Sequence, residues 1–146
     1  MATAANLPPD DVSHGLDASP VEFGVAAMDL AHRNLLNELS QLRDVCDQEF
    51  VRCYPALVAA VERDFREEEN LMETLGLSSF RAHLEQHARM LAALHCTMSG
   101  ACGGDTAPAR AAVGLLREWM EFHIPSMDRE LAAAMQARSA PGATMQ

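Results

Sequence analysis

The chain has 146 residues, 49% of them hydrophobic, which suits a single globular domain with its own core. Its 21 acidic and 11 basic residues give a formal net charge of −10, so nucleic acid and anionic membrane surfaces are unsuitable partners. We expect a cytoplasmic protein with mostly free thiols, because there is no apolar run of membrane-spanning length, no signal-peptide pattern and no CxxC pair among the cysteines.

Four segments carry the spacing of amphipathic helices. Ala, Leu and Met are abundant while aromatic residues make up only 5%, and this mixture favours helices over strands. Apolar residues recur every three or four positions in each segment, which gives each predicted helix one face for a core. The predicted helices cover about residues 28–46, 55–75, 79–99 and 108–135.

The remaining segments are predicted to connect or flank these helices. Residues 1–20, rich in Pro, Ala and Asp, are expected to form a flexible arm, and residues 138–146 a flexible tail. Turns are predicted at about 47–55 and 100–108. Short loops between consecutive helices predict an all-α, up-down-up-down four-helix bundle over residues 21–137.

Ionisable residues fall on the helix faces that should form the core. Residues four apart lie about 6 Å from each other on one helix face, so such a pair can reach one ion. Buried charges are costly unless they are paired or bind metal, which favours a metal site over a hydrogen-bonded core network or a solvated surface. Imidazoles mixed with carboxylates suit iron, and suit manganese or zinc less specifically. The candidate ligands are His32, Asp64, Glu68, His83, His87, His123 and Asp128.

Two rival metal sites do not match the spacing. The run from His83 to His87 reads HLEQH, not the HExxH of zinc metalloproteases. No Glu-x-x-His pair occurs, although ferritin-like di-iron proteins use that pair.

The order of these motifs resembles that of bacterial hemerythrins over about residues 23–133. The resemblance implies a bundle that holds two iron ions, joined by an oxo or hydroxo bridge and by carboxylates. One iron would be bound by three histidines and the other by His32. The three histidines are His83, His87 and His123, and the bridging carboxylates are Glu68 and Asp128. The matching stretches are FGVAAMDLAHRNLLNEL, DFREEENLM, FRAHLEQHARML and WMEFHIPSMDREL.

One position departs from the family pattern. The second-helix motif of the family begins with His-Phe, whereas this chain has Asp64-Phe65. We favour direct ligation of the second iron by Asp64. The alternatives are that Asp64 hydrogen-bonds a ligating water, that His14 supplies the missing imidazole, or that the second iron is weak or absent.

The spacing at the end of the last helix predicts an irregular turn. His123 and Asp128 are five residues apart, about 140° around an ideal α-helix, so both reach one site only if the helix is distorted. Pro125 lies between them and cannot donate a helical hydrogen bond, which favours a π-like turn. Trp119, one turn earlier, is expected to support the His123 ring, while Glu69 is expected at the surface.

The resemblance implies a protein that binds dioxygen for storage, delivery or sensing. The alternative is an oxidase or peroxidase acting on oxygen or hydrogen peroxide, or an iron-binding regulatory protein, and the sequence leaves enzymatic activity open. Asp64 makes catalysis more credible, because an anionic ligand favours Fe(III) over Fe(II). We expect no nucleic-acid or membrane partner, and a monomer.

Overall fold

The computed structural model describes residues 21–142, and all regular secondary structure within this range is helical. The predicted arm, with His14, and the last four residues of the predicted tail lie outside the described residues. No helix in the described part of the chain is both long and apolar enough to cross a membrane. The helices are α1 (Ala26–Arg43), α2 (Asp47–Leu75), α3 (Phe80–Cys96), α4 (Met98–Cys102), α5 (Ala107–His123), η1 (Ile124–Asp128) and α6 (Arg129–Ser139).

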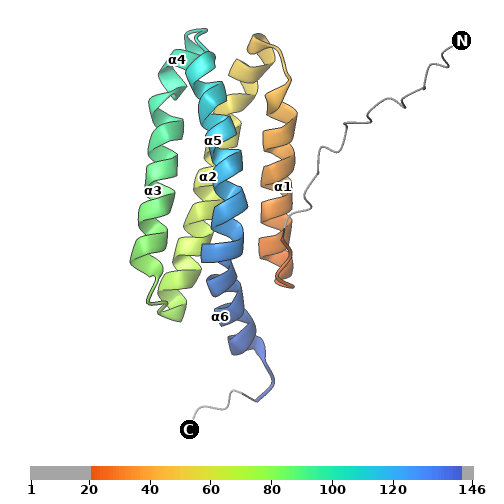
Figure 1. Cartoon of the computed structure of the whole chain (residues 1–146), viewed down its shortest axis with the longest axis vertical. Coiled ribbons are helices and arrows are strands. Elements are labelled where there is room, and N and C mark those ends of the chain that lie inside the picture. The colour runs from red at the N-terminus through yellow and green to blue at the C-terminus, as the bar shows by residue number, and fades with distance from the viewer. Residues whose placement is uncertain (1–20, 143–146) are drawn as a thin grey trace, which may run out of the picture.

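Four long rods lie side by side and alternate in direction (Figure 1). The first three are α1, α2 and α3, and the fourth runs from α5 through η1 into α6. Helix α1 contacts α2 and α5, and α3 contacts the same two helices on the other side. This arrangement confirms the predicted all-α, up-down-up-down bundle.

The predicted turn at residues 47–55 is wrong, because α2 already begins at Asp47 and includes Pro55. A proline within a helix costs about 3 kcal/mol. Here the turn before it buries two aromatic rings, Phe50 and Tyr54, which stack with centroids 5.2 Å apart. Tyr54 also donates a hydrogen bond to the Leu94 carbonyl at 2.9 Å. Burial of each large side chain stabilises by about 1.5–3 kcal/mol, which offsets the cost of the proline.

The other predicted boundaries shift by smaller amounts. The predicted loop at 100–108 is partly helical, because α4 occupies Met98–Cys102 at the end of the bundle. Helix α6 continues to Ser139, slightly beyond the predicted end of the bundle at residue 137.

The apolar core is divided into two clusters. The larger cluster includes Leu39, Tyr54, Leu94 and Leu116, all almost fully buried. The smaller one consists of Met28, Met72, Leu131 and Ala132, with partly buried neighbours. Candidate ligands on three rods fall between residues of the two clusters: His32 lies between Met28 and Leu35, Glu68 between Phe65 and Met72, and Asp128 between Ile124 and Leu131. A polar layer therefore crosses an otherwise apolar bundle.

Candidate metal centre

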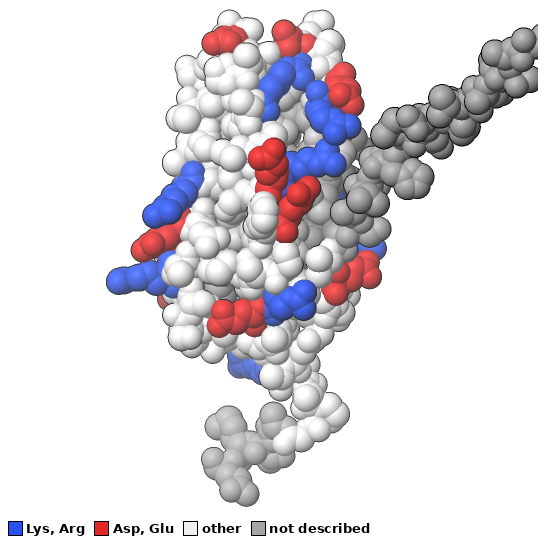
Figure 2. Space-filling view, in the orientation of Figure 1, with Lys and Arg blue, Asp and Glu red and all other residues white. Residues whose placement is uncertain are grey.

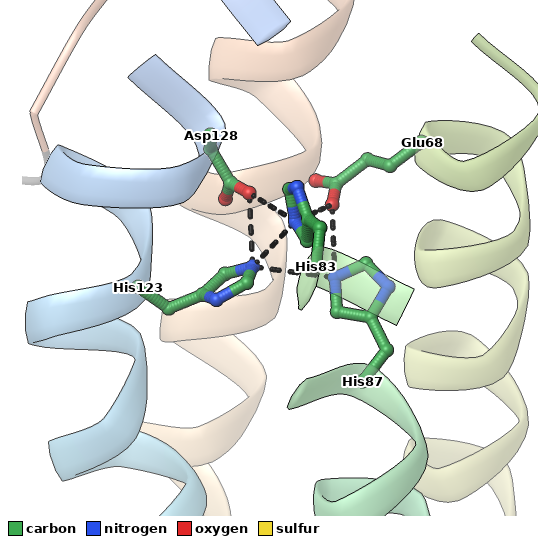
Figure 3. Close-up of side chains that lie close together, drawn as sticks. All are labelled: Glu68, His83, His87, His123 and Asp128. Carbon is green, nitrogen blue, oxygen red and sulfur yellow. Dashed lines mark hydrogen bonds and ion pairs between the residues drawn. The ribbon is translucent and has the colours of Figure 1, made fainter. Parts of the chain in front are cut away.

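Three buried imidazoles point toward one another from two helices. His83 and His87 lie one turn apart on α3, and His123 ends α5. The Nε2 atom of His123 lies 2.8 Å from Nε2 of His83 and 3.2 Å from Nε2 of His87. Figure 3 shows the three rings converging with Glu68 and Asp128. One potential ligand atom from each of these five residues lies within 4.8 Å of the others.

The two carboxylates each present one oxygen to the three-histidine group and the other to His32. Asp128 Oδ1 lies 3.0 Å from His123 Nε2, while Oδ2 lies 2.9 Å from His32 Nε2. Glu68 Oε2 lies 3.3 Å from His87 Nε2, while Oε1 lies 3.4 Å from His32 Nε2. This is the arrangement that two carboxylates need in order to bridge two neighbouring ions.

The donor atoms fit a metal ion better than a hydrogen-bonded network. Within the described residues, Glu68 Oε2, Asp128 Oδ1 and both ring nitrogens of His32 are buried without a hydrogen bond of acceptable geometry. Buried polar atoms normally have partners, so these atoms indicate a missing one. Ligands at about 2.1 Å from an ion and at right angles to each other lie about 3 Å apart, whereas tetrahedral ligands lie about 3.4 Å apart. The separations around His123 Nε2, from 2.8 to 3.2 Å, match the right-angled case.

A π-helical turn brings His123 and Asp128 to the same side. Residues Ile124–Asp128 form this turn, and the Arg129 amide donates to the Ile124 carbonyl five residues earlier. Pro125 lies inside the turn and has no amide hydrogen to lose. The predicted π-like turn is therefore confirmed.

Burial and close opposite charges shift the titration of the cluster. Burial alone would lower the pKa of His32 and His83, but Asp128 and Glu68 outweigh it and raise both to about 9. Burial alone would raise the pKa of Glu68, but the adjacent imidazoles lower it to about 2. His123 differs, because burial dominates and lowers its pKa. The carboxylates thus stay ionised, and a metal ion must displace protons from His32 and His83.

Comparisons with known proteins agree with this geometry. Residues 24–135 match the family model described as "Hemerythrin HHE cation binding domain". The chain belongs to the hemerythrin family. It is 30% identical over 118 residues to a bacteriohemerythrin of Ralstonia nicotianae, covering 81% of this chain and 86% of that protein. It is 24% identical over 122 residues to a bacteriohemerythrin of Methylococcus capsulatus, covering 80% and 93% of the two chains. No solved structure matches significantly.

In this hemerythrin-family chain, Asp64 lies outside the five-residue cluster. Asp64 lies one turn before Glu68 on α2, partly buried and outside the group of mutually close donor atoms. Its nearest cation is Arg63, with Nε 3.9 Å from Oδ1. Burial raises the pKa of Asp64 to about 6; Arg63 opposes this, and nearby carboxylates, Glu38 on α1 among them, add to it. The structure therefore brings together all the predicted ligands except Asp64.

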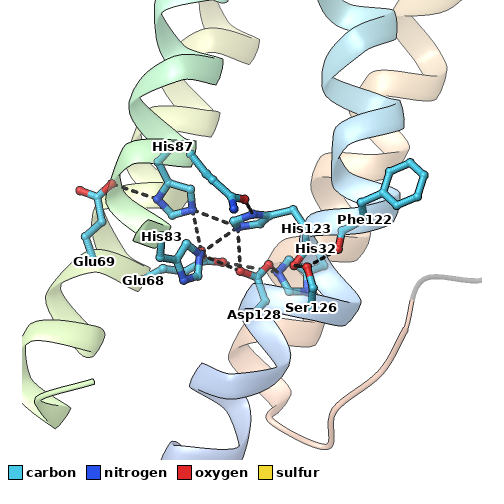
Figure 4. Close-up of polar contacts among 10 residues, drawn as sticks. His32, Glu68, Glu69, His83, His87, Phe122, His123, Ser126 and Asp128 are labelled. Carbon is cyan, nitrogen blue, oxygen red and sulfur yellow. Dashed lines mark hydrogen bonds and ion pairs between the residues drawn. The ribbon is translucent and has the colours of Figure 1, made fainter. Parts of the chain in front are cut away.

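Two residues that orient the histidines were missed by sequence reasoning. Glu69, predicted to be a surface charge, places Oε1 2.9 Å from Nδ1 of His87. Gln86 places Oε1 3.0 Å from Nδ1 of His123. Each oxygen can accept the Nδ1 proton, which leaves Nε2 free to bind metal. Figure 4 shows Glu69 reaching His87 on the far side of the ring from the cluster.

Aromatic rings pack against three of the imidazoles. Phe65 stacks on His87 with ring centroids 3.8 Å apart. Trp119 stacks on His123 at 3.9 Å, as predicted from its place one turn earlier. Phe23, in the segment before α1, meets the His32 ring edge-on with ring centroids 6.3 Å apart. These contacts limit water access and hold the rings in place.

Proposed function

We propose that the chain holds two iron ions between its helices and binds dioxygen there. The observation that carries this proposal is the split orientation of Glu68 and Asp128, each with one oxygen toward His32 and one toward the other histidines. Three imidazoles and two carboxylate oxygens would hold the first ion. The second would be held by His32, by the other two carboxylate oxygens and, we propose, by Asp64. The ions would supply the electrons that reduce bound oxygen.

The chain's own residues would control access and orientation. The His32 side offers fewer protein donors than the three-histidine side, which leaves room for a small ligand there. Phe65 and Trp119 exclude water from the imidazoles that they stack on. Glu69 and Gln86 would keep the Nδ1 protons in place, so that Nε2 of His87 and His123 faces the metal.

Anaerobic loading with Fe(II), followed by iron analysis, tests the site first. We expect two irons per chain, and a visible absorption band that forms when oxygen is added and fades when oxygen is removed. One iron or none per chain would refute the di-iron proposal. Two irons with no reversible band would leave the site intact but refute reversible oxygen binding.

A second candidate is an oxidase or peroxidase, and Asp64 is the observation that favours it. A carboxylate at position 64 in place of an imidazole would add negative charge to the site, which would stabilise Fe(III) and shorten the life of a reversible oxygen complex. Irreversible oxidation of the iron-loaded protein by oxygen, with turnover of hydrogen peroxide in the presence of a reductant, would support this candidate. Reversible oxygenation without turnover would refute it.

A further inference from the structure

A groove runs between α3 and α5, and its lining includes the buried side chains of Met90 and His123. Its volume is about 510 Å³, which lies in the range of small-molecule sites, about 300–1,000 Å³. Figure 2 shows an uncharged strip of surface here, between charged side chains over α3 and others over α5. The groove is lined by Gln86, Arg89, Met90, Ala93, Leu115, Trp119, Phe122, His123 and Ser126.

One wall of the groove is an exposed apolar stripe on α5. Leu115, Trp119 and Phe122 follow one another at intervals of four and three residues, so they share a helix face. Leu115 is 51% exposed and Phe122 is 76% exposed. Figure 4 shows the Phe122 ring directed away from the metal cluster, so it does not wall the cluster. Apolar side chains gathered at a concave surface are typical of a ligand site.

The charge of the lining is opposite to that of the whole chain. The protein carries a formal net charge of −10, yet no Asp or Glu lines the groove. Arg89 is the only Arg or Lys in the lining. Within the described residues Arg89 forms no salt bridge, so its guanidinium is available to an anion. The groove thus combines an apolar surface with one cation that can bind a carboxylate through two hydrogen bonds.

We propose that this groove binds a small amphipathic carboxylate. Its hydrocarbon or aromatic body would lie against Leu115, Trp119 and Phe122, and its carboxylate would pair with Arg89. The ligand would touch the outer side of His123 and Gln86 without supplying a donor to the metal cluster. Binding in this groove does not require the proposed di-iron chemistry, so the two can fail separately.

The chain carries its own reporter for this site, because Trp119 is its only tryptophan. Octanoate is the probe, and octanol, with the same chain length and no charge, is the matched comparison. We titrate each into the purified full-length protein at a recorded metal content and follow tryptophan fluorescence, with calorimetry as a second readout. We expect saturable binding of octanoate that is at least tenfold tighter than binding of octanol.

Matched variants separate the groove from nonspecific effects. Arg89→Gln should weaken octanoate binding about tenfold and leave octanol binding unchanged. Arg81→Gln, on the same helix but outside the groove, should change neither. Ala93→Phe should fill the groove and abolish binding of both probes, whereas Ala92→Phe on the exposed side of α3 should not. Circular dichroism checks that each variant keeps its helical content.

Several results would overturn the proposal. Equal affinity for octanoate and octanol, or an Arg89→Gln variant that binds octanoate as well as the parent, would show that the cation has no role. Absence of saturable binding would refute the site itself. A dimer that Phe122→Ser converts to monomers, without any carboxylate binding, would assign the groove to contacts between copies of the chain.

Discussion

Replacement of Glu69 by alanine removes the acceptor that holds the His87 ring. Oε1 of Glu69 lies 2.9 Å from Nδ1 of His87, and that imidazole is fully buried. With Nε2 fixed on a metal ion, the Nδ1 proton cannot turn toward another partner, and an unsatisfied buried donor costs about 1–3 kcal/mol. At about 1.4 kcal/mol per tenfold, this corresponds to a loss of roughly 5- to 150-fold in metal affinity. Outer partners of metal-bound histidines typically contribute about 10- to 100-fold, in the same range.

Competition with a chromophoric chelator for Fe(II) under anaerobic conditions measures this loss. Glu69→Gln keeps an oxygen acceptor and should lose less affinity than Glu69→Ala. Glu67→Ala is the matched control, because Glu67 is exposed on the same helix and makes no contact with a ligand histidine. If Glu69→Ala bound Fe(II) as tightly as Glu67→Ala, the Glu69–His87 contact would have no part in holding the metal.

Three further predictions concern the second ion, the pH dependence and the helix interior. Asp64→His should raise the reduction potential of the bound iron, measured by redox titration, and prolong any reversible oxygen complex, measured by the decay of its absorption band. An unchanged potential would show that Asp64 does not act on iron. Because His32 and His83 titrate near 9 in the folded chain and at 6.5 ordinarily, their stabilising contribution is full below pH 6.5 and is lost as pH rises through 9. Urea unfolding of the metal-free protein should therefore show falling stability over this range, and a constant or rising value would contradict the assigned pKa shifts. Tyr54→Phe should cost about 0.5–1.5 kcal/mol in the same assay, because the buried hydroxyl loses its hydrogen bonds with the Leu94 carbonyl and Thr97, while Thr97 Oγ1 still donates to that carbonyl. A cost near zero would show that water replaces the hydroxyl.

Sequence periodicity predicted the bundle because each helix carries a regular apolar face. It failed at Pro55, where the local signal for a turn is strong but the burial of Phe50 and Tyr54 depends on the opposing helix. The π turn at Ile124–Asp128 was predictable for a different reason. The spacing of His123 and Asp128 is incompatible with a regular helix if both residues serve one site.

Six of the seven candidate ligands, all but Asp64, were predictable as a group that lies together, whereas Glu69 and Gln86 beside them were not. His83 and His87 are four residues apart, and this spacing alone predicts that they share a helix face. The contact of Glu69 with His87 depends on the relative rotation of α2 and α3, which no interval within one helix encodes. In the run Glu67 to Glu69, Glu67 is exposed, Glu68 faces the Nε2 atoms of the histidines and Glu69 faces Nδ1 of His87. Composition alone could not assign these three different positions to three identical side chains.

The polar layer leaves one end of the bundle with a small apolar cluster of its own. The cluster around Met28, Met72, Leu131 and Ala132 is small and is cut off from the main core by ionised groups. If those groups bind metal as proposed, they would cross-link the rods on both sides of the layer. Without metal, the layer between the main core and the lower parts of α1, α2 and α6 in Figure 1 would hold the rods together only through ion pairs, such as His32–Asp128 and His83–Asp128. Amide hydrogen exchange should then accelerate at this end by local opening while the amides around Leu94 and Leu116 remain protected, so that occupancy of the site becomes a difference in the motion of one end of the bundle.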